Sequence, residues 1–183
     1  VAAGPFAGDA AALALRTEGL ARELRARHEG CPPSAVPGLA EARALYRSFG
    51  MDPSRHRPSS EALLRRVLLG KELYRIGCAV DTCNLASLSF LLPIGLYDLG
   101  RVDGDIELRV GEVGDAYAGI RKDDVNVGGR LALYDRTGPF GSPTSDSART
   151  SVSDGTRDLL AVVMATGACP TASMSGHLDV LAG

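Results

Sequence analysis

The most constraining feature of this sequence is a change of pattern at LLPIG, residues 91–95. Before this point, apolar residues recur every three or four positions, which is the spacing of amphipathic helices. After it, glycines separate short apolar runs that are typical of β-strands. Helices followed by strands predict an α+β fold, in which N-terminal helices precede a mainly antiparallel, sandwich-like β-sheet module with helices packed on it.

The individual elements follow from the same periodicities and from local stop signals. Glu18 with Arg22, and Glu23 with Arg27, are expected as ion pairs on the polar face of the first helix. Helices are predicted over residues 9–29, 37–49 and 173–181. Another is capped by Ser59 or Ser60 and has Leu63, Leu64, Val67 and Leu68 on its apolar face. A further helix is capped by Asp81 or Thr82, buries Leu85, Leu88 and Leu92, and is stopped by Pro93. The predicted strands are Ile94–Tyr97, Ile106–Val110, Arg130–Tyr134 and Leu159–Thr166.

Length and charge limit the classes of protein to consider. A chain of 183 residues that is 45% hydrophobic can bury one sizeable core, so we expect a single domain over residues 1–183, with residues 1–50 as a helical extension. Twenty basic residues nearly balance 22 acidic ones, so any RNA partner must be held by a local patch of charge. No apolar run approaches the roughly 20 residues that a membrane helix needs, and no membrane association is expected.

The cysteines bear on compartment and metal binding. Cys31, Cys78, Cys83 and Cys169 are scattered without a CxxC pair, which favours free thiols in a reducing compartment and therefore the cytoplasm. A zinc site formed by Cys78, Cys83 and His56 is the alternative, but the spacing is wider than structural zinc sites use. We therefore expect neither a metal nor a cofactor.

Motifs of the common enzyme classes are absent. The sequence contains no GxSxG, no GxxxxGK[ST] phosphate loop, no HExxH and no GxGxxG after a strand. His28, His56 and His177 do not stand beside a Ser or a Cys in the context of a catalytic triad.

Three polar segments are candidates for a site. Asp81, Asn84 and Ser87 recur at a spacing of three and form a polar stripe, which indicates either helix capping or a pocket lining. Residues 144–156, TSDSARTSVSDGT, form either a solvated loop or a functional one ordered around an Arg149 to Asp146 ion pair. Residues 55–66, RHRPSSEALLRR, hold the densest basic cluster; no aromatic residue interleaves with its arginines, so a base-stacking platform is not predicted.

Taken together, five segments resemble a known family. They are RPSSEALLRR, VDTCNLASLSFLLPIGLYDL, DGDIELRVGEVGDAY, GRLALYDRTG and DSARTSVSDGT, in this order. They resemble the editing and tRNA-binding module (B3/B4) of the phenylalanyl-tRNA synthetase β subunit, and more closely its free-standing relatives. The resemblance places the module at residues 55–165. Where the family ordinarily has a His just after a Pro-Leu pair, this chain has Gly95.

The resemblance implies a protein that binds aminoacylated tRNA and hydrolyses a mischarged ester, with a non-catalytic RNA-binding or small-ligand-binding module as the alternative. A structural or partner-binding domain is a third interpretation. An aminoacyl ester is already activated, so a site need only position water and stabilise the oxyanion. The expected catalytic residues are Asn84, Asp98, Glu112 and Arg149; the expected pocket residues are Asp81, Ser87, Asp146 and Thr150; the expected tRNA contacts are Arg57, Arg65 and Arg66.

Overall fold

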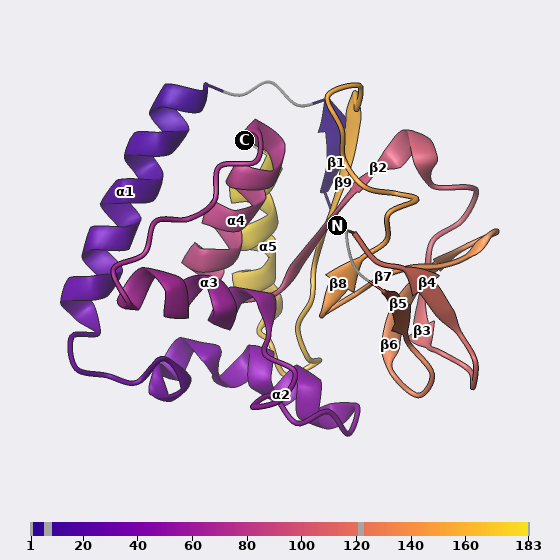
Figure 1. Cartoon of the computed structure of the whole chain (residues 1–183), viewed down its shortest axis with the longest axis horizontal. Helices are drawn as coiled ribbons and strands as arrows, with labels where there is room; N and C mark the ends of the chain where they lie inside the picture. The colour runs from indigo at the N-terminus through magenta and orange to yellow at the C-terminus, as the bar shows by residue number, and fades with distance from the viewer. Residues whose placement is uncertain (1, 6–8, 121–122, 183) are drawn as a thin grey trace.

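The structure, a computed structural model, describes residues 2–5, 9–120 and 123–182, with helices on one side and sheets on the other (Figure 1). The helical side begins at Asp9, whose carboxylate accepts hydrogen bonds from Ala11 N and Ala12 N and so caps the first helix. The helices are α1 (Ala10–Arg27), α2 (Ala40–Ser48), α3 (Ser59–Leu68), α4 (Cys78–Phe90) and α5 (Thr171–Ala182), with short 3-10 helices η1 (Pro33–Ala35), η2 (Pro37–Leu39) and η3 (Leu99–Arg101).

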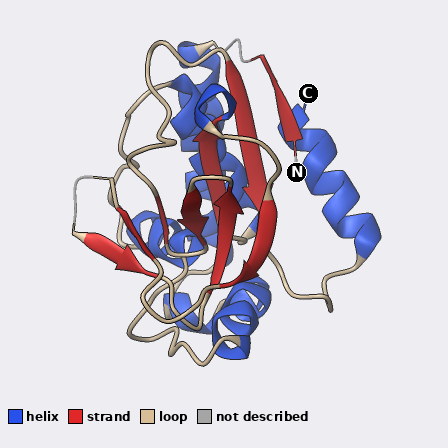
Figure 2. Ribbon diagram, turned by 90° about the vertical axis from the view of Figure 1, so that its right-hand side faces the viewer, coloured by secondary structure: helices blue, strands red, loops and turns tan. Residues whose placement is uncertain are grey.

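The strands of the described residues form antiparallel sheets. One sheet has the order β1-β9-β2, a second has β3-β6-β7-β8, and β4 pairs with β5. Figure 2 shows the long strands running through the middle of the molecule, with helices behind and beside them. The strands are β1 (Ala2–Pro5), β2 (Ile94–Asp98), β3 (Glu107–Val110), β4 (Ala116–Ala118), β5 (Asp124–Asn126), β6 (Leu131–Asp135), β7 (Gly138–Ser142), β8 (Ser145–Asp146) and β9 (Asp158–Val163).

This architecture confirms the α+β class and the order of helices before strands. Each predicted helix and each predicted strand has a counterpart within a few residues. Five strands, β1, β4, β5, β7 and β8, were not predicted. That the whole chain forms one domain, with residues 1–50 as an extension, stays a prediction.

Two predicted helix starts are wrong in detail. The helix expected to begin at Asp81 or Thr82 begins at Cys78, which places Asp81 inside its first turn. Ser59 and Ser60 do not cap α3, because Pro58 occupies the cap position and the Ser60 hydroxyl donates instead to Leu91 O at 3.1 Å. Leu91 adopts a left-handed conformation with φ 57°, and so ends α4 before Pro93 is reached.

The core has a helical part and a sheet part. In the helical part, Leu24 of α1 and Leu88 of α4 pack with the apolar face of α3, where Leu64 and Val67 are fully buried. In the sheet part, Tyr97 of β2 meets Phe140 of β7 edge to face, with ring centroids 5.0 Å apart. This contact joins the two larger sheets, as the sandwich prediction requires.

Gly95 packs against the Tyr97 side chain, which leaves no room for a Cβ at position 95. A Cβ on Gly95 would lie 2.2 Å from the Tyr97 hydroxyl oxygen, and a Cβ on Gly141 of the facing sheet would lie 2.1 Å from the same atom. The Tyr97 ring therefore fills the space beside both glycines. Its hydroxyl is buried without a hydrogen bond of normal geometry to the described residues, and burial, with the Asp146 carboxylate adding to it, raises the pKa of Tyr97 well above its usual value.

Replacing Gly95 by Ala is therefore expected to lower the free energy of unfolding by about 1–3 kcal/mol, because the new methyl group overpacks the Tyr97 ring. Adding Tyr97→Phe should recover part of the loss, since the ring carbon at 2.7 Å remains. Urea unfolding followed by circular dichroism measures both. Gly19→Ala in α1 is the matched control: its Cβ meets nothing within 4 Å, so it should stabilise. Equal stability of Gly95→Ala and wild type would contradict this packing.

Candidate functional site

A large cavity among the described residues is a groove between α1, α4 and the segment that joins α3 to α4. We call this joining segment, residues 71–77, the strap; Figure 1 shows it running between α1 and α4. The groove has a volume of about 600 Å³, which is in the range of small-molecule sites. Its polar and charged lining residues are Thr17, Glu18, Arg22, Arg25, Lys71, Glu72, Tyr74, Arg75, Asp81 and Asn84.

Part of the predicted polar stripe on α4 faces this groove. Asp81 and Asn84, three residues apart on one helix, both line it. Asp81 also accepts a hydrogen bond from Ile76 N at 3.0 Å through Oδ1, and so anchors the strap. Ser87 lies elsewhere: it is buried and donates to Leu92 O at 2.7 Å. Asp81 and Asn84 thus line the groove, and Asp81 also makes a local hydrogen bond at the start of α4; that the groove is a substrate pocket stays a prediction.

The strap is held by side chains from three helices. The Arg66 guanidinium of α3 donates to Glu72 O and, at 3.1 Å, to the Tyr74 hydroxyl. It also lies over the Tyr74 ring, 3.9 Å from its centroid. An aromatic side chain thus does join the basic cluster, contrary to the sequence-based expectation. The contact was missed because Tyr74 follows Arg66 by eight residues, beyond the turn at Gly70.

The cations of the groove are only partly neutralised. Glu18 pairs with Arg75 of the strap at 3.6 Å, not with Arg22 as predicted, whereas the predicted Glu23 to Arg27 pair does form. Arg22, Arg25 and Lys71 make no ion pair with the described residues. Nothing in the sequence pattern alone indicated that these three side chains share one groove.

Residues 144–156 are ordered around Arg149, but its partner is not the predicted one. Arg149 makes a bidentate ion pair with Asp135 of β6, at 2.8 and 2.9 Å, rather than with Asp146, and donates to Arg101 O at 3.2 Å. The Asp135 carboxylate is fully buried. Burial raises the pKa of Asp135, but the hydrogen bonds from Arg149, Asp103 N and Thr137 outweigh it and hold the pKa well below its usual range.

Asp135 should therefore make stability depend on pH. Because its pKa is lower in the folded than in the unfolded state, its contribution is present above about pH 4 and lost as the pH falls below that value. Asp135→Asn is expected to be less stable than wild type at pH 7, with a shallower fall in stability between about pH 4 and 2. Urea unfolding at a series of pH values measures this. Asp154→Asn, at an exposed carboxylate, should keep the wild-type slope, and a wild-type slope in Asp135→Asn would refute the assignment.

Further hydrogen bonds of residues 144–156 involve β2 and the loop itself. Asp98 accepts from Gly100 N at 3.0 Å and from the Thr156 hydroxyl at 2.7 Å, and its own N–H donates to Thr150 O. The buried Thr150 hydroxyl lies 3.0 Å from that of Ser147. Asp146 accepts a hydrogen bond from Leu96 N at 3.4 Å. These contacts fasten the loop to β2.

The structure thus brings the expected residues together in two groups. Asp81 and Asn84 share the groove, while Asp98, Asp146, Arg149 and Thr150 belong to the loop network. The remaining expected residues lie apart from both groups or at their margin. Ser87 is a buried residue of α4, and Glu112 is exposed in a turn. The Arg57 Nε lies 3.7 Å from the Glu61 carboxylate, Arg65 is exposed, and Arg66 contacts the strap.

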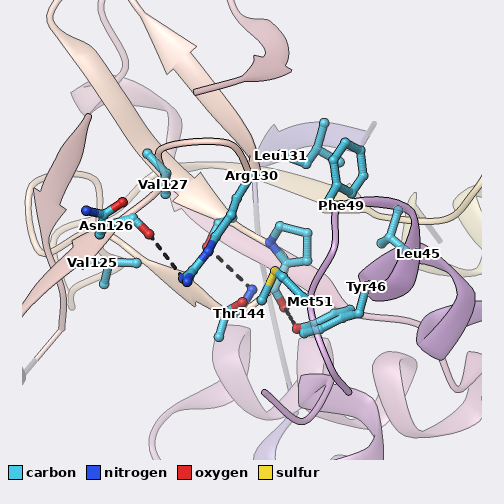
Figure 3. A pocket seen from close by; sticks show the side chains of 12 residues that line it. Leu45, Tyr46, Phe49, Met51, Val125, Asn126, Val127, Arg130, Leu131 and Thr144 are labelled. Carbon is cyan, nitrogen blue, oxygen red and sulfur yellow. Dashed lines mark hydrogen bonds between the residues drawn. The ribbon is translucent and has the colours of Figure 1, made fainter. Parts of the chain in front are cut away.

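A second, much smaller cavity lies between α2 and the sheets (Figure 3). Its volume is about 30 Å³, enough for a water molecule or two but not for a substrate. Tyr46 closes one end by donating to Pro143 O at 2.6 Å, and Arg130 donates to Asn126 O at 3.3 Å on the other. A third cavity, of about 560 Å³, opens where the end of α1 meets the end of α3. Of the three, only the groove is lined by residues expected at the site, Asp81 and Asn84, and we therefore regard the groove as the candidate site.

Neither a metal-binding cluster nor a membrane-spanning helix occurs among the described residues. They contain no group of three or more His, Cys, Asp or Glu side chains arranged to hold a metal ion. Among the same residues, no helix has both the length and the apolar character needed to cross a membrane.

Comparison with known proteins places the chain in a family. The model of the B3/4 domain matches residues 41–175, and because this is well over half of the sequence, the chain belongs to the B3/4 domain family. Membership supports a tRNA-binding or nucleic-acid-binding module related to that of the phenylalanyl-tRNA synthetase β subunit; by itself it does not establish editing. No curated protein matches the sequence. Helix α1, which forms one wall of the groove, lies outside the matched residues.

Proposed function

We propose that this protein binds aminoacylated tRNA in the cytoplasm, with the acceptor end lying in the groove between α1, the strap and α4. The observation that supports the proposal is the composition of that groove, where unpaired cations stand beside Asp81 and Asn84. The net charge of the chain is −2, so attraction to phosphates has to come from such a local concentration of cations.

Each part of the groove suits a part of this ligand. Arg22 and Arg25 on one wall, and Lys71 on the strap, are placed to neutralise backbone phosphates. On the opposite wall, the Asp81 carboxylate suits a free α-ammonium group and the Asn84 amide suits a carbonyl or a ribose hydroxyl. Arg57, Arg65 and Arg66, on and before α3, would extend the contact to the acceptor stem.

A second candidate function is hydrolysis of a mischarged ester, and the Asp81 and Asn84 pair favours it. In this proposal Asp81, through its second oxygen, takes a proton from a bound water that attacks the ester carbonyl. The Asn84 amide stabilises the oxyanion, and the ribose oxygen leaves with the proton from Asp81. Parts for Asp98, Glu112 and Arg149 in the reaction, and for Ser87, Asp146 and Thr150 in the pocket, stay predictions.

The test of tRNA binding is a filter-binding titration at several salt concentrations. The wild type should bind deacylated and aminoacylated tRNA with an affinity that falls steeply as salt rises. The double variant Arg22→Glu, Arg25→Glu should bind at least about tenfold more weakly, because both groove cations are reversed. Arg16→Glu is the matched control, since Arg16 is exposed on α1 but does not line the groove. Equal losses in the two variants would refute the groove as the site.

The test of hydrolysis is a panel of aminoacyl-tRNAs, with ester loss compared against the spontaneous rate. At least one should be hydrolysed faster by wild type, and Asn84→Ala should slow that reaction at least about tenfold, since the amide acts in the transition state. Binding without acceleration of any ester in a full panel would leave the binding function and exclude the deacylase.

A further inference from the structure

The strap presents an aromatic ring to the groove. Tyr74 lines the groove, yet it is 65% exposed, which is unusual for a tyrosine in a folded chain. The ring is nevertheless held in place, because Arg66 lies over it at 3.9 Å and donates to its hydroxyl at 3.1 Å. Arg66 is itself fixed through its hydrogen bond to Glu72 O.

A fixed aromatic ring beside unpaired cations is the arrangement by which proteins bind unpaired nucleotides. A base stacks on the ring, and cations on either side of the groove neutralise the flanking phosphates. Here Lys71 lies three residues before Tyr74 on the strap, and Arg25 lies on the wall formed by α1. Three carboxylates also line the groove: Glu18 is paired with Arg75, Asp81 accepts a hydrogen bond from Ile76 N, and Glu72 makes no ion pair with the described residues. They are outnumbered by the four cations of the lining, Arg22, Arg25, Lys71 and Arg75.

We infer that Tyr74, backed by Arg66, is a stacking platform for one base of an unpaired RNA strand, with Lys71 and Arg25 on its phosphates. This inference rests on the proposed tRNA binding and adds to it the kind of RNA that the groove takes. The bases of a duplex are already stacked on both faces, so a lone exposed ring selects an unpaired end over a helical stem. Stacking of this kind tolerates any base, so the platform recognises strandedness rather than sequence.

The inference predicts how Tyr74 variants bind three RNAs: intact tRNA, the same tRNA trimmed of its unpaired 3′ nucleotides, and a blunt hairpin. Tyr74→Ala should weaken intact tRNA binding about 5- to 150-fold, the range measured for loss of one base stack. Tyr74→Phe, which keeps the ring, should stay within about twofold of wild type. Trimmed tRNA and the hairpin should bind wild type more weakly, and Tyr74→Ala should not weaken them further.

The outcomes separate this inference from the function on which it rests. If wild type fails to bind any tRNA, the proposed function is lost. If wild type binds intact tRNA and Tyr74→Ala binds it equally well, the stacking platform alone is wrong. If Tyr74→Ala weakens the blunt hairpin as much as the intact tRNA, the groove takes duplex RNA and the inference is overturned. Because Tyr74 is exposed, unchanged circular dichroism of the variants shows that folding is not the cause.

Discussion

Arg43→Ala is expected to lower the free energy of unfolding by about 3–5 kcal/mol, among the largest effects of a single substitution in this chain. Arg43 of α2 makes two hydrogen bonds to the Glu61 carboxylate of α3, at 2.8 and 2.7 Å. The Glu61 side chain is only 4% exposed, so removing Arg43 leaves a buried carboxylate without its main partner. Arg57, whose Nε lies 3.7 Å from Glu61, places the expected loss toward the lower end of that range.

Two further variants isolate the cause. Arg47→Ala removes an exposed arginine from the same helix and should change the free energy of unfolding by no more than about 0.5 kcal/mol. The double variant Arg43→Met, Glu61→Met replaces both charges by apolar side chains and should recover most of the loss, because no unpaired charge stays buried. Urea unfolding at pH 7 measures all three. If Arg43→Ala and Arg47→Ala were equally mild, the ion pair would have little part in joining α2 to α3.

Leu88→Ala is expected to cost about 2–5 kcal/mol, the range for truncating a fully buried leucine. Leu88 has no exposed surface and lies in the helical core with Leu24, Leu64 and Val67, so its loss leaves a cavity where three helices meet. Thermal and urea unfolding both measure the change. Leu15→Ala, at a leucine 71% exposed on α1, is the control and should be close to neutral. A neutral Leu88→Ala would mean that α4 does not pack as described.

The helical half was predictable because apolar residues that recur at helical spacing are buried along α2, α3 and α4. Leu64, Val67 and Leu88 could be assigned to the core from their spacing alone. The missed strands lack such a signal: β7 reads GPFGS, and β4 buries only Tyr117 in three residues. Their pairing depends on turns and on partners far along the chain. Helix starts were harder to predict, because the N-cap residue of α4 is Gly77, which makes no side-chain capping hydrogen bond.

The candidate site, too, could be predicted from the sequence only in part. The shared face of Asp81 and Asn84 follows from helix geometry and could be predicted, because three residues separate them on α4. The partner of Arg149 could not, since Asp135 and Asp146 are both within reach in sequence and only the fold of β6 selects between them. The Arg66 contact with Tyr74 also depends on the path of an irregular segment, for which no periodicity exists.

The position of α1 has a practical consequence for the expression of fragments of this chain. A fragment trimmed to the matched residues 41–175 would lack Arg22, Arg25 and Leu24 together. The groove would lose its α1 wall, and the apolar surface that α1 covers would face water. Under the proposed function, such a fragment would bind RNA more weakly than the whole chain, and its exposed apolar surface would lower its solubility, so the choice of boundaries affects what an assay detects.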